Sequence, residues 1–141
     1  MENNVSKMQM GVLPYIIAVD FDGTLVEDEF PAIGDPIQST WEDIRLAKEL
    51  GAKIILWTCR DHENLDEAVE FCRERGLTFD AINENLSETK ELFNNDTRKV
   101  YANEYWDDKA ISHYSKIRSI LQAAAPIECD CGCCCDEGSP C

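Results

Sequence analysis

The stretch Tyr15-Ile16-Ile17-Ala18-Val19-Asp20-Phe21-Asp22-Gly23-Thr24-Leu25 passes from an apolar run directly into two aspartates. The run predicts a short buried strand, which we expect from about Leu13 to Asp20. Side chains two residues apart on an extended chain point the same way, so Asp20 and Asp22 share one face. Gly23 then allows a tight turn. Close carboxylates are unfavourable without a cation or proton between them, so the pattern indicates either an acidic turn or part of a metal and phosphate site.

Composition limits the classes of protein to which the chain can belong. Its 141 residues, 44% hydrophobic and 29% charged, suit one ordinary globular domain with a proper core. The 13 Lys and Arg against 28 Asp and Glu give a net charge of −15, which argues against binding of long nucleic acids. No apolar run is long enough to span a membrane, and the segment from Gly11 to Val19 has no signal-peptide cleavage site. We therefore expect a cytoplasmic protein with no membrane partner.

Strand and helix patterns alternate along the chain. We expect strands at residues 13–20, 53–58, 78–82 and 101–106, and helices at residues 35–51, 64–75 and 110–124. Asp35 is the expected N-cap of the first helix and Pro36 its first residue. Residues 25–34 fit an irregular loop or a small hairpin, and the polar residues 83–96 stay unassigned. This alternation predicts an α/β domain of Rossmann-like, three-layer type around a mostly parallel sheet.

The domain is expected to cover residues 13–125, between a flexible N-terminus at 1–12 and a Cys-rich acidic tail at 126–141. Six of the eight cysteines lie in this tail. The tail lacks two separated C-x-x-C pairs, so a zinc ribbon is unsupported. A loose thiolate metal site, redox pairing and an inert disordered tail stay open, with the last favoured. Cys59 is interpreted as a half-buried structural cysteine.

Parallel sheets bind ligands beyond the carboxyl ends of their strands. That rule places residues 20–24, 58–60, 83–85 and 107–108 at one rim of the predicted sheet. The rim would hold four carboxylates and a threonine hydroxyl, near the cations Arg60, Arg98 and Lys99. Carboxylate oxygens suit Mg²⁺, which keeps water ligands for exchange with a phosphate. A carboxylate can also attack phosphorus.

Four segments of the chain resemble the four motifs of the haloacid dehalogenase (HAD) superfamily, in the order of that family. The residues from Asp20 to Leu25 resemble motif I, and Ile54-Ile55-Leu56-Trp57-Thr58 resembles motif II. Lys99 fits motif III, and Trp106-Asp107-Asp108 fits motif IV. The resemblance spans roughly residues 13–124 and is to the small, capless, phosphatase-type members. It implies a HAD-like fold without a large cap, and an Mg²⁺-dependent phosphohydrolase that acts on a phosphomonoester through an aspartyl-phosphate.

Carried over position by position, the resemblance implies a role for each motif residue. Asp20 would be the nucleophile and a metal ligand, and Asp22 the general acid and base with its backbone carbonyl on the metal. Thr58 would bind a phosphoryl oxygen, and Lys99 would stabilise the negative charge, with Arg98 as the alternative cation. Asp107 would bind Mg²⁺, directly or through water, assisted by Asp108. Candidate substrate contacts are Gly23, Thr24, Arg60, Asn83 and Asn85.

Several of these residues also have an interpretation that requires no function. Arg60 fits an ordinary surface charge equally well, and Asn83 and Asn85 fit turn residues without a function. Asn103 and Glu104 interrupt the last predicted strand, which indicates an edge position or a short strand. Two other function classes stay open: a metal-binding protein that uses the Cys-rich tail, and a HAD-fold interaction domain without catalysis.

The segments where caps are usually inserted are used up by fold elements, so we expect an open site. It would take a small phosphorylated substrate or a phosphoprotein, unless self-association covers it.

Overall fold

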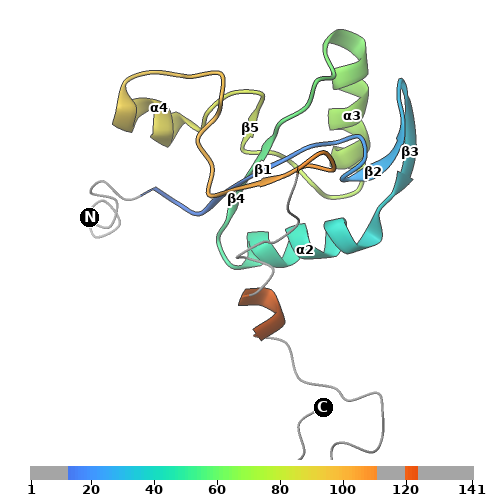
Figure 1. The fold of residues 1–141 in the computed structure, drawn as a ribbon, viewed down its shortest axis with the longest axis horizontal. Coiled ribbons are helices and arrows are strands. Elements are labelled where there is room, and N and C mark those ends of the chain that lie inside the picture. Colours follow the sequence, from blue (N-terminus) through green and yellow to red (C-terminus); the bar gives the residue numbers. More distant parts are fainter. Residues whose placement is uncertain (1–12, 111–119, 124–141) are drawn as a thin grey trace, which may run out of the picture.

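A parallel four-stranded sheet forms the centre of the computed structural model, which describes residues 13–110 and 120–123. Its strands are β1 (Ile16–Val19), β4 (Lys53–Leu56), β5 (Ala81–Ile82) and β6 (Glu104–Trp106), in the order β5-β4-β1-β6 (Figure 1). Each observed strand lies inside a predicted range and is shorter than it. The predicted α/β fold with a central parallel sheet is confirmed.

β1 is a central strand, and its register fixes the rest of the sheet. Ile17 pairs with Ile54 of β4 on one side and with Glu104 of β6 on the other. β1 is apolar up to its last residue, Val19, which pairs with Leu56 of β4 and with Trp106 of β6. The residues that follow β1 and β6 therefore emerge side by side at the carboxyl edge of the sheet.

Residues 25–34 contain most of a β-hairpin, one of the two arrangements that the sequence allows. β2 (Val26–Glu29) pairs in antiparallel fashion with β3 (Ala32–Pro36). The predicted helix start at Asp35 and Pro36 is wrong, because both residues belong to β3. The extended chain continues to Ile37, whose N–H donates to the Leu25 carbonyl at 2.9 Å. Helix α2 (Gln38–Glu49) begins only after this hydrogen bond, without a side-chain cap.

The other helices follow the predicted pattern in part. α3 (His62–Glu74) begins two residues before its expected start, and α4 (Ser87–Phe93) lies in the segment that the sequence leaves unassigned. Residues 120–123 are helical, within the helix expected at 110–124. The rest of that helix, the N-terminus at 1–12 and the Cys-rich tail at 126–141 lie outside the described residues.

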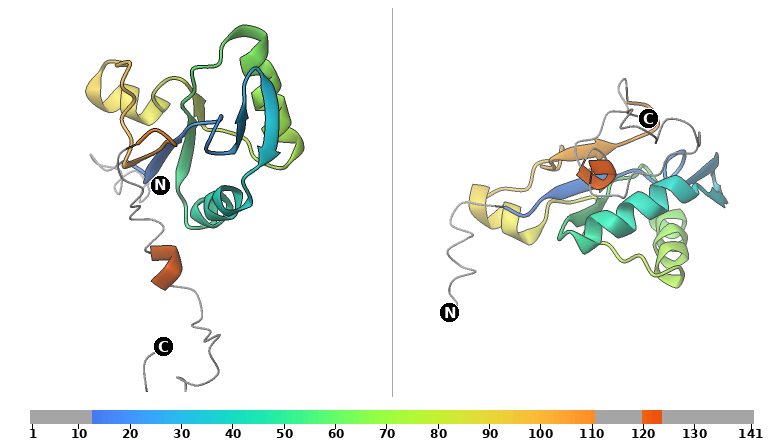
Figure 2. Two further views of the ribbon diagram at one scale, coloured as in Figure 1. Left: turned by 45° about the vertical axis from the view of Figure 1, so that its right-hand side comes forward. Right: turned by 90° about the horizontal axis from the view of Figure 1, so that it is seen from below.

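Both faces of the sheet are covered, as its continuous apolar strands require. On one face Ile17 and Val19 pack with buried residues of α2 and α3, such as Trp41 and Ala68. On the other face Ile16 and Ala18 pack with residues from the 86–100 segment, which contains α4. Figure 2 shows α4 well apart from α2 and α3. The layers agree with the predicted three-layer architecture.

β6 is an outer strand of three residues, as its polar composition predicts. Glu104 is buried there, and its carboxylate accepts hydrogen bonds from Trp106 Nε1 at 2.8 Å and from the Tyr15 hydroxyl. Asn103 Oδ1 accepts a hydrogen bond from the Ile16 amide at 2.7 Å. These polar residues therefore fix β6 to β1 instead of breaking the strand. Among the helices that the structure describes, none combines the length and apolar character that a membrane crossing requires.

Candidate functional site

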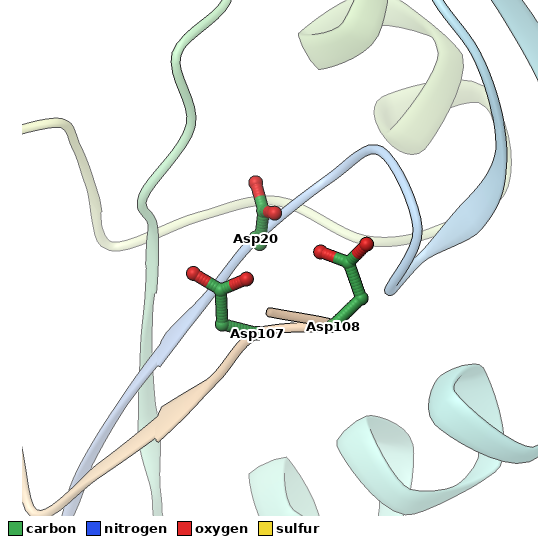
Figure 3. Close-up of side chains that lie close together, drawn as sticks. All are labelled: Asp20, Asp107 and Asp108. Carbon is green, nitrogen blue, oxygen red and sulfur yellow. The ribbon is translucent and has the colours of Figure 1, made fainter. Parts of the chain in front are cut away.

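Three aspartates meet at the carboxyl edge of the sheet. Asp20, Asp107 and Asp108 each offer an oxygen that lies within 4.8 Å of the others (Figure 3). Asp20 directly follows β1, and the other two directly follow β6, so the parallel pairing of these strands brings the three together. Asp20 is half-buried, whereas Asp107 and Asp108 are exposed. We call these three residues the aspartate cluster.

Asp20 is held in place at both its backbone and its side chain. Its amide donates to the Trp106 carbonyl at 2.9 Å, and its Oδ1 accepts a hydrogen bond from the Phe21 amide at 2.8 Å. Burial raises the pKa of Asp20 to about 7; the hydrogen bond from Phe21 opposes this, and repulsion by Asp107, Asp108 and Asp22 adds to it. The carboxyl group is thus in a place where a cation would strongly favour its charged form.

Gly23 and Thr24 seat Asp108 in the aspartate cluster. Gly23 has a φ of +86°, and a Cβ at this position would lie 2.3 Å from Asp108 Oδ2, so only glycine leaves room for this carboxylate. Thr24 Oγ1 accepts a hydrogen bond from the Asp108 amide at 3.1 Å. Gly23 and Thr24 therefore shape the part of the site that holds the aspartate cluster, and a direct contact with substrate stays a prediction.

Asp22 does not join the aspartate cluster and instead binds Arg60. Nε and Nη2 of Arg60 donate to the two carboxylate oxygens of Asp22, each at 2.8 Å. The remaining N–H groups reach the carbonyls of Ala32, Pro31 and Asn64, at 2.8, 3.1 and 3.4 Å. Since a guanidinium has five N–H donors, all of them are used within the protein.

Arg60 is 2% exposed, so its interpretation as a surface charge is wrong. Its guanidinium lies between the rings of Phe21 and Phe30, 5.0 and 5.1 Å from their centroids. It thereby ties the segment that follows β1 to the tip of the β2–β3 hairpin and to the start of α3. Cys59, the preceding residue, is exposed and not half-buried as predicted.

Thr58 and Asn83 lie at the carboxyl ends of neighbouring strands, as predicted. Thr58 Oγ1 accepts a hydrogen bond from the Arg60 amide at 3.1 Å, and the Thr58 amide donates to Asn83 Oδ1 at 2.9 Å. Asn83 has a φ of +53°, which asparagine tolerates better than most residues. Asn83 thus links β4 to the end of β5. Among the described residues, the Thr58 hydroxyl donates its own hydrogen to no acceptor.

Lys99 and Asn85 are not brought to the aspartate cluster. Lys99 Nζ lies over the Tyr105 ring, 5.3 Å from its centroid, and forms no ion pair within the described part of the chain. Asn85 is buried, where Nδ2 donates to Asp96 Oδ1 at 2.8 Å and Oδ1 accepts from the Tyr101 amide at 2.7 Å. These hydrogen bonds hold the loop before β6, which gives Asn85 a structural role.

Of the two remaining cations near the site, Arg98 pairs with a residue outside the aspartate cluster, whereas Lys109 contacts the cluster itself. Arg98, the alternative to Lys99, is paired with Asp96 at 3.0 Å. Lys109, which the sequence analysis missed, donates from its amide to Asp107 Oδ1 at 2.9 Å and from Nζ to Asp108 Oδ2 at 3.2 Å. Its position directly after the aspartate pair was the available signal.

Comparison with known proteins finds one informative relative. No family profile and no curated protein matches the chain. Among solved structures, a conserved protein coded by a locus from Bacteroides thetaiotaomicron is 39% identical, with a TM-score of 0.63. The match covers 76% of this chain and 86% of that one. The chain therefore belongs to the same family as this conserved protein from Bacteroides thetaiotaomicron.

Proposed function

We propose that the protein is an Mg²⁺-dependent phosphomonoesterase of the HAD type. The observation that carries the proposal is the convergence of Asp20, Asp107 and Asp108 at the carboxyl edge of a parallel sheet. The resemblance of four segments to the HAD motifs supports the same function. Cytoplasmic location belongs to the proposal as well.

The donor set of the aspartate cluster fits Mg²⁺. Three carboxylate oxygens from two adjacent strand ends are the hard ligands that this ion prefers, and few protein ligands leave positions for water. The raised pKa of Asp20 supports the same fit, since burial and three neighbouring carboxylates disfavour its charge when no cation compensates. Bound there, Mg²⁺ would neutralise the aspartates and the charge of an incoming phosphate.

Asp20 is the proposed nucleophile. Its Oδ1 is held by the Phe21 amide, whereas its other oxygen accepts no hydrogen bond from the described residues. That second oxygen attacks phosphorus, and the bond from phosphorus to the leaving oxygen breaks. Water then attacks phosphorus, which breaks the bond to Asp20 and releases inorganic phosphate. Thr58 can donate its hydroxyl hydrogen to a phosphoryl oxygen, and Lys109 supplies a cation in place of Lys99.

Asp22 is the proposed proton donor to the leaving oxygen and the proton acceptor from the attacking water. Both of its oxygens accept hydrogen bonds from Arg60, so one of these bonds must open when Asp22 takes up a proton. The candidate substrates are small phosphorylated molecules and phosphorylated protein segments. A second copy of the chain that covers the open site remains part of the proposal.

A second candidate function is divalent-cation binding without turnover. It is favoured by the same Arg60 contact, which occupies the proposed proton donor, and by the position of Lys99 away from the aspartates. This candidate takes up the interaction-domain alternative that the sequence leaves open. The tail alternative concerns residues outside the described part of the chain.

Hydrolysis of 4-nitrophenyl phosphate with and without Mg²⁺ tests the proposal. We expect turnover that requires Mg²⁺ and falls by about a hundredfold or more in Asp20→Asn, because the nucleophile is lost. Asp66→Asn on the exposed side of α3 is the matched control and should keep full activity. If a panel of nucleotides, sugar phosphates and phosphopeptides gives no turnover while calorimetry detects Mg²⁺ binding, the second candidate replaces the first.

A further inference from the structure

A groove of about 480 Å³ lies outside the aspartate cluster, between α4 and β6. Its volume is within the range of roughly 300–1,000 Å³ that small-molecule sites occupy. Neither the proposed nucleophile nor the proposed metal ligands contribute to it. The side chains that shape it include those of Thr89, Phe93, Asn95, Lys99, Tyr101 and Tyr105.

Aromatic rings form one part of the groove and are open to solvent. Phe93, Tyr101 and Tyr105 are 52%, 42% and 38% exposed. The rings of Phe93 and Tyr101 lie 6.1 Å apart with a tilt of 52°. Exposed aromatic rings from a helix and from the region of an edge strand, gathered around one hollow, offer stacking surface to a planar ligand.

Charge in the groove is opposite to that of the chain as a whole. The protein has 28 Asp and Glu residues, yet none is among the described residues that line the groove. Nearby cations are neutralised, since Lys90 pairs with Glu84 at 2.9 Å and Arg98 with Asp96 at 3.0 Å. Lys99 lines the groove and has no such partner in the described part of the chain. Its ammonium group is therefore available to an anion.

Thr89 supplies the observation that points to a ligand. The residue is 3% exposed, and its Oγ1 has no hydrogen-bond partner among the described residues. A buried hydroxyl without a partner is unfavourable, and each such group calls for an explanation. Thr89 forms part of the groove wall and its Oγ1 is itself covered, so a ligand atom that hydrogen-bonds to it must first displace a neighbouring side chain.

We propose that this groove binds a small planar aromatic anion. The ring stacks on Phe93 and Tyr101, the negative group lies at Lys99, and a polar atom reaches Thr89. The two sources of this chemistry are nucleoside monophosphates and aromatic carboxylates. The proposal does not rest on the phosphatase function, because the groove and the aspartate cluster use different residues.

Calorimetric titration of the full chain in EDTA tests the proposal without contribution from a divalent metal. The probes are AMP, 1-naphthoate and inorganic phosphate. We expect AMP, 1-naphthoate or both to bind more tightly than phosphate. Binding of AMP alone identifies a nucleotide site, and binding of both identifies a general site for aromatic anions. The proposal is overturned if neither AMP nor 1-naphthoate binds at millimolar concentration, or if inorganic phosphate binds as tightly as they do.

Two variants locate the binding. Phe93→Ala should weaken the bound aromatic probe by about tenfold through lost stacking, whereas Leu92→Ala, a neighbour on α4 of similar exposure that does not line the groove, should leave affinity unchanged. Thr89→Val should weaken binding severalfold without lowering the midpoint of urea unfolding, because it removes an unpartnered hydroxyl. Equal affinities for the Phe93 and Leu92 variants, or unchanged affinity for Thr89→Val, contradict the assigned contacts.

Discussion

Both carboxylate oxygens of Asp22 accept hydrogen bonds from Arg60, each at 2.8 Å, and the Arg60 side chain is fully buried. The two residues follow adjacent strands, β1 and β4. A buried charge is tolerated only with a partner and with its remaining donors satisfied, and Arg60 meets both conditions through Asp22 and three backbone carbonyls. The contact is therefore a buried polar link between the segment that follows β1 and the tip of the β2–β3 hairpin.

Removal of the Arg60 guanidinium should destabilise the fold strongly. Arg60→Met leaves Asp22 without its partner and three carbonyls without donors, so we expect a loss of about 3–5 kcal/mol in the free energy of unfolding, measured in urea. Arg73→Met is the matched control, because Arg73 pairs with Glu70 on an exposed helix face and its removal should change stability little. If Arg60→Met lowers the free energy of unfolding by no more than Arg73→Met does, the buried contact between Arg60 and Asp22 is not important for stability.

A methyl group at Gly23 should displace Asp108. Gly23→Ala combines the strain of a positive φ with a contact of 2.3 Å to Asp108 Oδ2. Gly76 has the same φ of +86° and open space around it, so Gly76→Ala isolates the backbone strain, which we expect to be about 1–2 kcal/mol. Calorimetric Mg²⁺ affinity should fall in Gly23→Ala and stay unchanged in Gly76→Ala. The same affinity in both variants would mean that Asp108 is not needed for the ion.

The stability of the metal-free protein should fall between about pH 4 and pH 7 because of Asp20. Its pKa is raised from 3.8 to about 7, so in this window the folded chain keeps a proton that the unfolded chain has lost. Stability then decreases as pH rises through the window and levels off above it. Asp20→Asn removes this dependence.

The difference in the free energy of unfolding between wild type and Asp20→Asn separates the contribution of Asp20 from those of the other carboxylates. In EDTA, the free energy of unfolding of Asp20→Asn relative to wild type should rise by about 1–2 kcal/mol from pH 4 to pH 8. This rise is smaller than the full pKa shift implies, because the carboxyl group of Asp20 is partly open to solvent. Urea titrations at several pH values give the difference. A constant difference across the range would rule out the raised pKa, and Mg²⁺ should reverse the gain at pH 8.

Lys109 should oppose the binding of a divalent cation and favour the binding of phosphate. Its ammonium group lies 3.2 Å from Asp108 Oδ2, so Lys109→Ala should tighten Mg²⁺ binding, most clearly at low ionic strength. With Mg²⁺ present, the same variant should bind inorganic phosphate more weakly. Lys90→Ala removes an equivalent charge from α4, where it pairs with Glu84, and should alter neither affinity. Weaker Mg²⁺ binding in Lys109→Ala would instead mean that Lys109 positions Asp108.

The sequence was sufficient to predict the sheet and the place of the aspartates. An apolar run such as Ile16 to Val19 has few alternatives to a buried strand, and parallel strands present their carboxyl ends at one edge. That Asp20 and Asp107 lie at the same edge follows from those two facts, whereas their position side by side depends on the pairing of β1 with β6, which the sequence does not predict. The polar residue Glu104 also indicated correctly that the last strand is short and lies at the edge.

The contacts that depend on tertiary partners could not be predicted. Arg60 carries no sign of burial, because the carbonyls that satisfy it come from the hairpin and from α3. Pro36 is a good first residue of a helix, but here it ends β3, and the hydrogen bond from the Ile37 amide to the Leu25 carbonyl keeps the chain extended up to the start of α2. Lys99 lies in a loop whose path is set by the hydrogen bonds of Asn85, and no local pattern reports that path.

Because β6 is a short edge strand, the aspartate cluster is complete only while β6 is paired with β1. Asp108 and its partner Thr24 are separated by 84 positions in the chain, so the cluster forms only after the last strand docks on β1. A strand with three paired residues opens at little cost, and its amide hydrogens should exchange well before those of β4. An ion shared by Asp20 and Asp107 would join the two strand ends. The concentration of divalent cations would then set how often this edge of the sheet detaches.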